Sequence, residues 1–208
     1  MTSRDIVHAK YPAPAVELVP EPLTQRDYEL LKGGFRTYRD LLLCKLLRAT
    51  ALRVSEVLGS RNRNGPRARG GLTPAHLREE PPDFCLLVRR AKKRTGEAIF
   101  ERMYLPPDLG LELRDFIRGN CVPPDRRIFD ISDRQVENAF AAAGIKTLGR
   151  RVRPHELRGL YVKTLLEGGL PLEAASKMVG HADPRTTLRF YYRLTGEQRA
   201  RIQRMIPV

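Results

Sequence analysis

The sequence predicts an α+β fold that is mainly helical and contains one small antiparallel sheet. Residues 84–90 and 99–105 have strand character and flank the turn-forming residues 94–97, a pattern typical of a β-hairpin. From residue 107 onward, apolar residues recur at the spacing of α-helices and show no further strand pattern. At 208 residues, the chain is long enough for one domain with its own hydrophobic core.

Residues 1–20 are predicted to be an extended lead-in rather than a folded unit. Pro12, Pro14 and Pro20 stand among small apolar residues, a composition that disfavours regular helices and strands. The folded domain is therefore expected to cover residues 21–208.

The first helices of this domain are predicted from a cap and from apolar periodicity. Thr24 and Asp27 have the spacing of a capping box at the start of a helix over residues 25–32. A leucine-rich helix is expected over residues 38–48, and another begins within residues 50–58. A basic loop over residues 61–71 follows, in which glycine and asparagine favour irregular structure.

The chain after the hairpin is predicted to be entirely helical. Ser132 is a cap, while Gly168, Gly169 and Gly180 end helices. The final helix is amphipathic, with apolar residues set among arginines. The predicted ranges are 109–118, 133–143, 155–167, 172–178, 184–192 and 196–205.

Positive charge is the strongest signal in the composition. The formal net charge is +14 and the sequence pI is near 10.3. A surface of this charge attracts polyanions through counterion release, so nucleic acid is the expected partner. Arginine outnumbers lysine, which suits bidentate phosphate contacts, although a GC-rich genome produces the same bias.

Membrane, secretory and metal-binding classes are not favoured. No apolar run approaches the roughly 18 residues that a membrane-spanning helix requires, and the first residues have no secretory signal. Cys44, Cys85 and Cys121 lack the spacing of a disulfide framework or a zinc site. We expect a reduced cytoplasmic setting in contact with the nucleoid, no metal and no cofactor.

His155 and Arg158 stand three residues apart at the start of a predicted helix. This spacing places both side chains on one face of the first turn. The helix N-terminus adds free backbone amides and the positive pole of the helix dipole. Such an end can offer two donors to one phosphate, although this spacing by itself is more often structural.

Arg53 is flanked by Leu52 and Val54, so we expect its side chain to be partly buried. A buried guanidinium needs a partner, and Glu56 is placed one helical turn on to hold it. The alternative is a solvated arginine in a surface salt bridge.

In order along the chain, these motifs resemble those of one protein family. They are Ala51-Leu52-Arg53 with Ser55-Glu56, a hairpin lysine, Pro154-His155 with Leu157-Arg158, and Gly180-His181 followed by Thr186-Thr187 and a tyrosine. This set resembles the catalytic domain of the tyrosine recombinase (phage integrase) family. The resemblance implies a catalytic domain over residues 21–208, ending in the helix over residues 196–205.

The resemblance implies a site-specific DNA recombinase or integrase that cleaves and rejoins strands through a covalent 3′-phosphotyrosine. Neither metal nor ATP is required, since preorganised arginine and histidine donors stabilise the charge that develops on the non-bridging phosphate oxygens. Two alternatives are a type IB-like topoisomerase activity, which uses the same chemistry to relax supercoils, and a catalytically inactive DNA-binding regulator.

The resemblance also assigns roles to individual residues. Arg53 and Arg158 become the clamp on the scissile phosphate, with Glu56 in support of Arg53. His155 and His181 become further phosphate ligands and proton handlers. Of these two, His155 is expected to accept the proton of the nucleophilic phenol.

The hairpin lysine and the nucleophile each leave an alternative open. Lys92 is expected to protonate the leaving 5′ oxygen, with Lys93 as the alternative. Tyr191 is the expected nucleophile, with Tyr192 as the alternative. The position nine residues after His181 holds Phe190, which has no hydroxyl, so a nucleophile lost there would leave an inactive protein.

Double-stranded DNA is the expected partner. By resemblance, the chain forms a homo-oligomer, a tetramer on DNA that is weak or monomeric off DNA, with residues 196–205 against a neighbouring copy. The family usually carries a helical core-binding domain ahead of this one, so the chain is either a fragment or a short member. The arginines expected to contact DNA are Arg61, Arg63, Arg67, Arg69, Arg90, Arg94, Arg151, Arg153 and Arg185.

Overall fold

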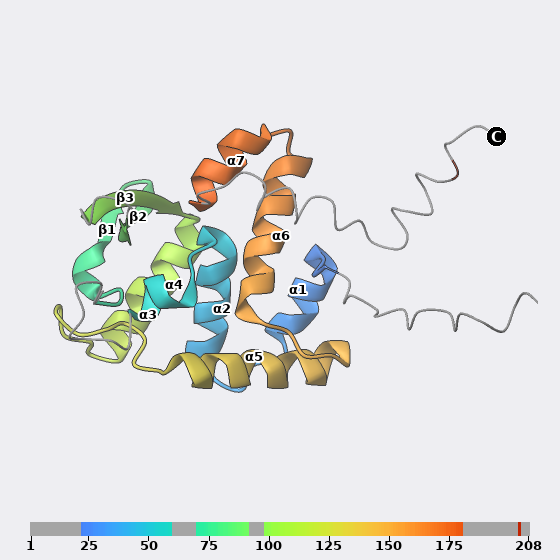
Figure 1. Ribbon diagram of the computed structural model, residues 1–208. Helices are drawn as coiled ribbons and strands as arrows, with labels where there is room; N and C mark the ends of the chain where they lie inside the picture. Colours follow the sequence, from blue (N-terminus) through green and yellow to red (C-terminus); the bar gives the residue numbers. More distant parts are fainter. Residues whose placement is uncertain (1–21, 60–69, 92–97, 181–203, 205–208) are drawn as a thin grey trace, which may run out of the picture.

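The computed structural model describes residues 22–59, 70–91, 98–180 and 204, and it has the predicted mainly helical α+β architecture (Figure 1). Its helices are α1 (Gln25–Lys32), α2 (Tyr38–Thr50), α3 (Val54–Leu58), α4 (Pro107–Gly119), α5 (Asp133–Leu148), α6 (Pro154–Glu167) and α7 (Leu172–Val179), with a 3₁₀ turn η1 (Pro74–His76). Its strands are β1 (Leu77–Glu80), β2 (Asp83–Ala91) and β3 (Ala98–Leu105).

Two of the predicted helix starts are confirmed together with their caps. The Thr24 hydroxyl accepts from the Asp27 backbone N–H at 3.1 Å, and Asp27 accepts from the Thr24 backbone N–H at 2.9 Å. Ser132 and Gln135 exchange the same pair of bonds at the start of α5. These reciprocal bonds satisfy amide groups that have no partner within the helix.

The link between α2 and α3 sets where the third predicted helix begins. The helix expected to begin within residues 50–58 is present, but it does not include Ala51, which adopts a left-handed conformation with φ of 52° and ends α2. Helix α3 starts only at Val54, and Arg53 precedes it with extended backbone as the N-cap. Arg53 therefore lies at a helix entrance rather than within a helix.

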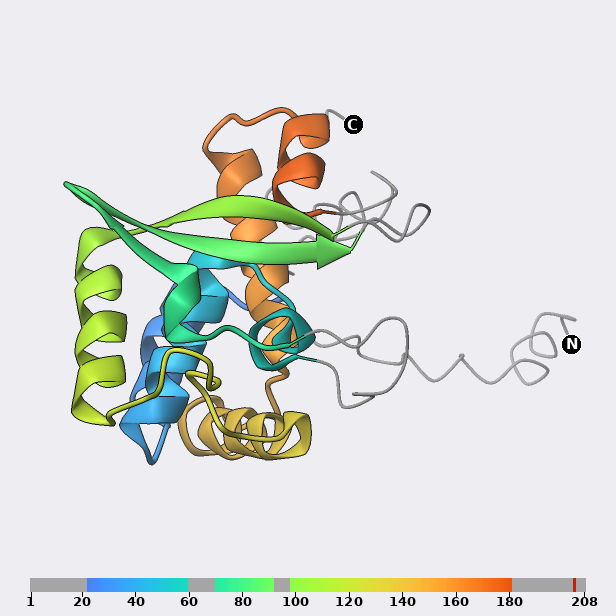
Figure 2. The same ribbon diagram turned by 90° about the vertical axis from the view of Figure 1, so that its left-hand side faces the viewer.

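The sheet is antiparallel with strand order β1-β2-β3. The predicted hairpin is confirmed, with Cys85 opposite Tyr104 and Arg89 opposite Phe100. Figure 2 shows its two long strands side by side across the molecule, with α4 at one end and α5 beneath. Strand β1 was not predicted, because Leu77–Glu80 is short and mostly charged, and it becomes a strand by pairing with β2.

The two faces of the hairpin differ in burial. Phe84, Leu86 and Val88 of β2 point into the core, as the period of two in a strand requires. On the outer face, Tyr104 is 59% exposed and Phe100 is 57% exposed. Its position in the register puts Tyr104 on the outer face, away from the core.

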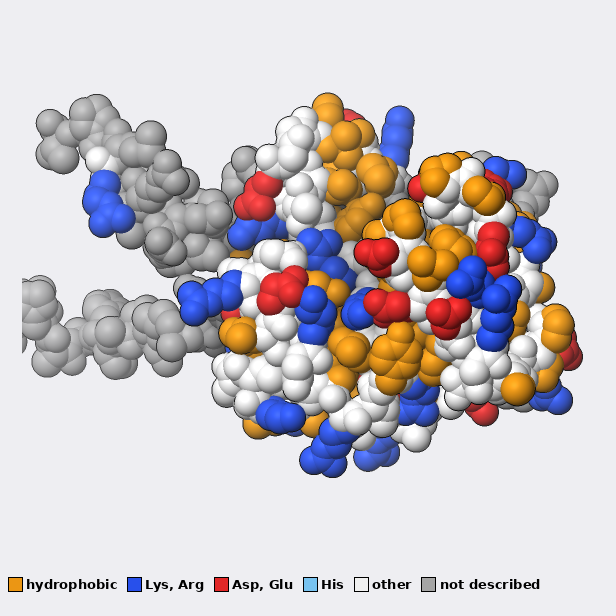
Figure 3. All heavy atoms as spheres, turned by 180° about the vertical axis from the view of Figure 1, so that it is seen from behind, with side chains coloured by type: hydrophobic (Ala, Val, Ile, Leu, Met, Phe, Trp, Pro, Cys, Tyr) orange, Lys and Arg blue, Asp and Glu red, His pale blue; other side chains and the backbone are white. Residues whose placement is uncertain are grey.

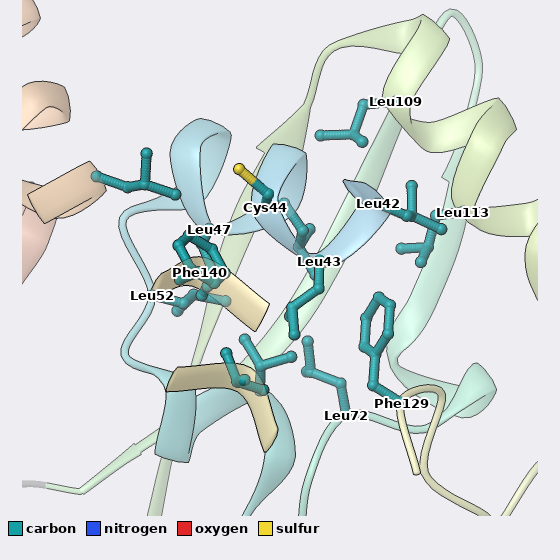
Figure 4. Close-up of a cluster of buried hydrophobic side chains, with 14 of the residues drawn as sticks. Leu42, Leu43, Cys44, Leu47, Leu52, Leu72, Leu109, Leu113, Phe129 and Phe140 are labelled. Atoms are coloured by element: carbon teal, nitrogen blue, oxygen red, sulfur yellow. The ribbon is translucent and has the colours of Figure 1, made fainter. Parts of the chain in front are cut away.

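Helix α2 is the centre of the hydrophobic core. It packs against α6 and α4, and its buried apolar residues are Leu42, Leu43, Cys44, Leu46 and Leu47. Figure 4 shows Leu43 of α2 lying between Leu113 of α4 and Phe140 of α5. A smaller cluster of Ala51, Val162 and Val179 joins the end of α2 to α6 and α7. Together these contacts fix the N-terminus of α6 relative to the α2–α3 link.

Several predicted segments lie outside the described residues: the lead-in over 1–20, residues 61–69 of the basic loop, the hairpin turn, and the helix over 184–192. Of the helix over 196–205, only Arg204 is described, and it is helical. The predicted stop at Gly180 is confirmed, since it ends α7 with φ of 68°. None of the helices in the described ranges is long and apolar enough to cross a membrane.

Candidate functional site

Arg158 lies at the centre of the candidate site and is only 2% exposed. Its Nη1 donates to the Ala51 carbonyl oxygen at 2.6 Å, and its Nη2 donates to the Val179 carbonyl oxygen. Burying a guanidinium is costly unless it is paired or hydrogen-bonded, and these two carbonyl oxygens accept its hydrogen bonds. Arg158 thereby ties α6 to the end of α2 and the end of α7.

Arg53 is held by Glu56, as predicted, but is more exposed than its apolar neighbours suggested. The Arg53 backbone N–H donates to Glu56 Oε2 at 2.8 Å, and Arg53 Nη1 lies 3.3 Å from Glu56 Oε1. The Glu56 side chain is 3% exposed, whereas that of Arg53 is 46% exposed. A buried carboxylate thus holds a guanidinium that still faces solvent.

His155 stands in the first turn of α6 and is exposed to solvent. Its pKa lies below the ordinary value of 6.5, first because surrounding protein removes part of its hydration, then because Arg158 and Arg53 are nearby cations. Glu156 opposes this lowering. Since both arginines act on the imidazole, the structure brings Arg53, His155 and Arg158 together from distant parts of the chain.

The first turn of α6 does not present its two predicted donors equally. His155 is exposed, but Arg158 lies beneath it with its guanidinium bound to backbone carbonyls. The spacing of three residues correctly placed them on one turn. It did not indicate that one side chain is buried, because burial depends on α2 and α7 packing over that turn.

Glu156 is a site residue that the sequence reasoning missed. One carboxylate oxygen accepts from the Arg153 backbone N–H at 2.8 Å, and the other lies 2.8 Å from Arg150 Nη1. Glu56 binds the N–H of Arg53 in the same way at the start of α3. The sequence does contain a signal for this capping role. Each of the two helices is preceded directly by an arginine, and a glutamate follows three residues after it.

The predicted DNA-contacting arginines are only partly described. Arg151 and Arg153 are exposed in the link into α6, where with Glu137, Ala141 and Val152 they line a hollow of about 440 Å³. Arg90 lies on β2. The remaining predicted site residues lie outside the described residues: Arg61, Arg63, Arg67, Arg69, Lys92, Lys93, Arg94, His181, Arg185, Tyr191 and Tyr192.

The face opposite to that of Figure 1 does not carry a continuous basic surface. In Figure 3, lysine and arginine side chains are interspersed with acidic and apolar ones across its described part. Acidic partners also offset some of the positive charge, since Arg114 forms ion pairs with Glu79 and Asp115. Over the same described ranges, no group of three or more histidine, cysteine, aspartate or glutamate side chains is placed to hold a metal ion.

Comparison with known proteins gives consistent matches. Residues 115–198 match the model of the phage integrase family. The tyrosine recombinase XerC of Pseudomonas savastanoi pv. phaseolicola is 29% identical over 174 residues, covering 79% of this chain and 52% of that protein. XerC of Pseudomonas fluorescens is 26% identical over 198 residues, covering 90% and 61%. The chain thus spans between half and two thirds of the length of these relatives.

Solved structures show the same fold at low sequence identity. XerH site-specific recombinase bound to its difH substrate matches with a TM-score of 0.64 at 15% identity, covering 89% of this chain and 54% of that one. XerA recombinase matches with a TM-score of 0.62 at 16% identity, covering 91% and 66%. The catalytic domain of bacteriophage HP1 integrase matches with a TM-score of 0.52 at 17% identity, covering 88% and 94%.

Proposed function

Because this chain belongs to the tyrosine recombinase (phage integrase) family, we propose that it is a site-specific recombinase that breaks and rejoins DNA through a covalent 3′-phosphotyrosine. The observation that carries this proposal is the convergence of Arg53, His155 and Arg158 in the order of the family's motifs. A solvent-facing guanidinium, a neighbouring imidazole and a buried positive charge suit a phosphodiester, whose non-bridging oxygens gain charge during in-line attack. The chemistry needs neither metal nor ATP.

Arg53 and Arg158 are proposed to act on the scissile phosphate in different ways. The exposed guanidinium of Arg53 is placed to donate to a phosphate oxygen, with Glu56 fixing its position. Arg158 adds positive charge from beneath and holds the Ala51 carbonyl two residues before Arg53. A preorganised donor stabilises the transition state without reorganising during the reaction.

His155 is proposed to accept the proton of the tyrosine nucleophile. Its lowered pKa keeps the imidazole neutral near pH 7, which is the form that accepts a proton. Tyr191 is the proposed nucleophile and Tyr192 its alternative; neighbouring cations favour loss of the phenol proton. His181 is proposed to assist, since it follows Gly180 and lies two residues after Val179, whose carbonyl binds Arg158.

Lys92 is proposed as the acid that protonates the leaving 5′ oxygen. In the sequence it directly follows Ala91, the last residue of β2. Lys93, the next residue, stays the alternative. The phosphotyrosine retains the energy of the cleaved phosphodiester bond. A free 5′ hydroxyl can therefore attack it and rejoin the strand without a further energy source.

Double-stranded DNA is the proposed partner. The charge of +14 and the exposed Arg151 and Arg153 beside α6 support it, and XerH and the Tn1549 integrase were solved in complexes with DNA. We further propose a cytoplasmic, nucleoid-associated protein that forms a tetramer on DNA, with residues 196–205 packing against a neighbouring copy. Residues 21–208 are proposed as the catalytic domain and residues 1–20 as its lead-in.

The test is capture of the covalent intermediate. A binding site is first selected from a pool of random duplexes, and a nicked version is incubated with wild type, Tyr191→Phe and Tyr192→Phe. We expect a protein–DNA adduct on a denaturing gel in wild type and Tyr192→Phe only. Loss only in Tyr192→Phe moves the nucleophile by one residue. No adduct on a bound site favours the inactive DNA-binding alternative, and relaxation of supercoils without recombinants favours the topoisomerase alternative.

A further inference from the structure

An aromatic and basic cluster lies on the outer face of the sheet, outside the proposed catalytic set. Phe100 of β3 is 57% exposed, although burying a phenylalanine ring is normally favourable. Its direct neighbour in the register is Arg89 of β2, which is also exposed. Cross-strand neighbours have Cβ atoms about 5 Å apart, so this ring and this guanidinium form one surface.

His76 extends this surface from the 3₁₀ turn η1. Its ring centroid lies 6.5 Å from that of Phe100, and the two ring planes differ by 25°. The Thr73 backbone N–H donates to His76 Nδ1 at 3.0 Å, which fixes the orientation of the imidazole. The cluster therefore presents two nearly parallel rings held by the sheet and by η1.

Charge on this surface favours a polyanion. Within the described part of the chain, no carboxylate forms an ion pair with Arg89, whereas Arg102 on the same face is paired with Glu80 at 3.3 Å. In the sequence, residues 89–94 read Arg-Arg-Ala-Lys-Lys-Arg, so five of the six residues from Arg89 onward are positively charged. Exposed rings beside uncompensated cations are typical of surfaces that stack nucleobases and track phosphates.

The place of the cluster links it to the proposed chemistry. Arg89 stands two residues before the end of β2 at Ala91, about 7 Å along the strand. Lys92, the proposed donor to the leaving 5′ oxygen, follows Ala91 directly. A cleaved strand must leave its complement before it can join another duplex, so bases beside the cut become unpaired during the proposed reaction.

We propose that His76, Arg89 and Phe100 form a docking surface for unpaired DNA bases beside the cleaved phosphodiester. The inference rests on the proposed recombinase function. Stacking on Phe100 holds a base and Arg89 holds its phosphate, so the surface favours the separated strand over the paired one. A base inside a duplex has its faces covered by its neighbours and gains little from the ring.

Equilibrium binding to two short duplexes tests this surface. The duplexes share one sequence, but one carries a central run of mismatched bases. Wild type is expected to bind the mismatched duplex more tightly. Phe100→Ala is expected to lose about five- to tenfold in affinity for it, in keeping with the lower end of the value of one base–aromatic stack. Phe100→Trp keeps a stacking ring and is expected to retain the preference. Arg89→Gln is expected to weaken binding and reduce its salt dependence.

Tyr104→Ala is the matched control, since Tyr104 is equally exposed on the same strand and face but stands opposite Cys85, away from the turn. The proposal is overturned if Phe100→Ala keeps the wild-type preference, if Tyr104→Ala loses it equally, or if wild type has none. Adduct formation separates the two proposals: a wild type that forms the adduct without preferring mismatched DNA contradicts only this surface. A wild type that binds neither duplex contradicts both. Melting curves confirm that each variant is folded.

Discussion

The guanidinium of Arg158 donates to the carbonyl oxygen of Ala51 at 2.6 Å, across 107 positions of sequence. Ala51 ends α2 in a left-handed conformation, and only Leu52 separates it from Arg53. The same guanidinium binds the Val179 carbonyl at the end of α7. Arg158 is thus a structural tie as well as a charge beneath the proposed phosphate site, so its loss has two separable effects.

Replacing Arg158 is expected to lower stability as well as activity. Arg158→Gln removes the two hydrogen bonds that the charged guanidinium donates to the buried carbonyls of Ala51 and Val179. This loss is expected to lower the free energy of unfolding by about 3 kcal/mol. Arg158→Lys keeps the charge but lacks the planar fork that reaches both carbonyls, so a smaller loss is expected. Urea denaturation measures both values. Wild-type stability in Arg158→Gln would show that these bonds contribute nothing to the fold.

Replacing Arg53 is expected to abolish cleavage with little change in stability. Its side chain is 46% exposed, and a partly exposed ion pair contributes about 0.2–1 kcal/mol. Arg53→Gln should therefore melt close to wild type yet give no adduct on the nicked duplex. A large drop in melting temperature would contradict this division between Arg53 and Arg158.

Glu56 is expected to matter for stability through the helix cap that it provides. Glu56→Ala removes the acceptor of the Arg53 backbone N–H, which costs about 0.5–2 kcal/mol. Glu56→Gln retains an oxygen acceptor and should cost less, although it loses the charge that holds the guanidinium. In urea denaturation, the free energy of unfolding should be higher for Glu56→Gln than for Glu56→Ala. The reverse order would show that the cap is not the main contribution of Glu56 to stability.

The pH dependence of cleavage is expected to follow His155. Because the folded state lowers the pKa of His155, its protonation opposes folding, so stability is full above pH 6.5 and falls as pH drops through the lower folded pKa. If neutral His155 accepts the phenol proton, adduct formation should rise with pH over the same window. His155→Gln should flatten this rising limb of the plot of adduct formation against pH. If the rise is unchanged in that variant, it reports the titration of another group.

Glu156→Gln is expected to shift that limb to lower pH. The amide oxygen still accepts from the Arg153 N–H, so the cap is kept, while the negative charge that raises the pKa of His155 is lost. The measurement is the pH profile of adduct formation. Glu173→Gln, an acidic residue in the first turn of α7, is the matched control and should leave the profile in place. A shift to higher pH in Glu156→Gln would contradict the electrostatic role.

A methyl group at Gly110 is expected to disrupt the packing of α4 on the sheet. A Cβ at Gly110 would overlap the side chain of the buried Phe84, so Gly110→Ala forces one of them to move, at a cost of about 1–3 kcal/mol. Gly119→Ala, at the end of the same helix, meets no atom within 4 Å and should gain about 0.5 kcal/mol. Equal melting temperatures for the two variants would show that α4 adjusts freely.

Local signals in the sequence were sufficient for most helices and for the hairpin. The capping box at Thr24, the Ser132 cap and the stop at Gly180 were predicted from a few neighbouring residues and are confirmed. Their interactions extend over three or four positions, so nearby sequence contains the needed information. Strand β1 was missed because its own residues do not favour a strand, and pairing with β2 decides its structure.

The sequence by itself determined the mainly helical class, the order of the motifs and the spacing that puts His155 and Arg158 on one turn. Only the tertiary structure decided that Arg158 is buried while Arg53 faces solvent, and that Tyr104 is exposed. Burial depends on which distant segments pack over a side chain. For Arg158 these segments are the ends of α2 and α7. Both are distant in the sequence, so the residues around Arg158 contain no pattern that predicts its burial.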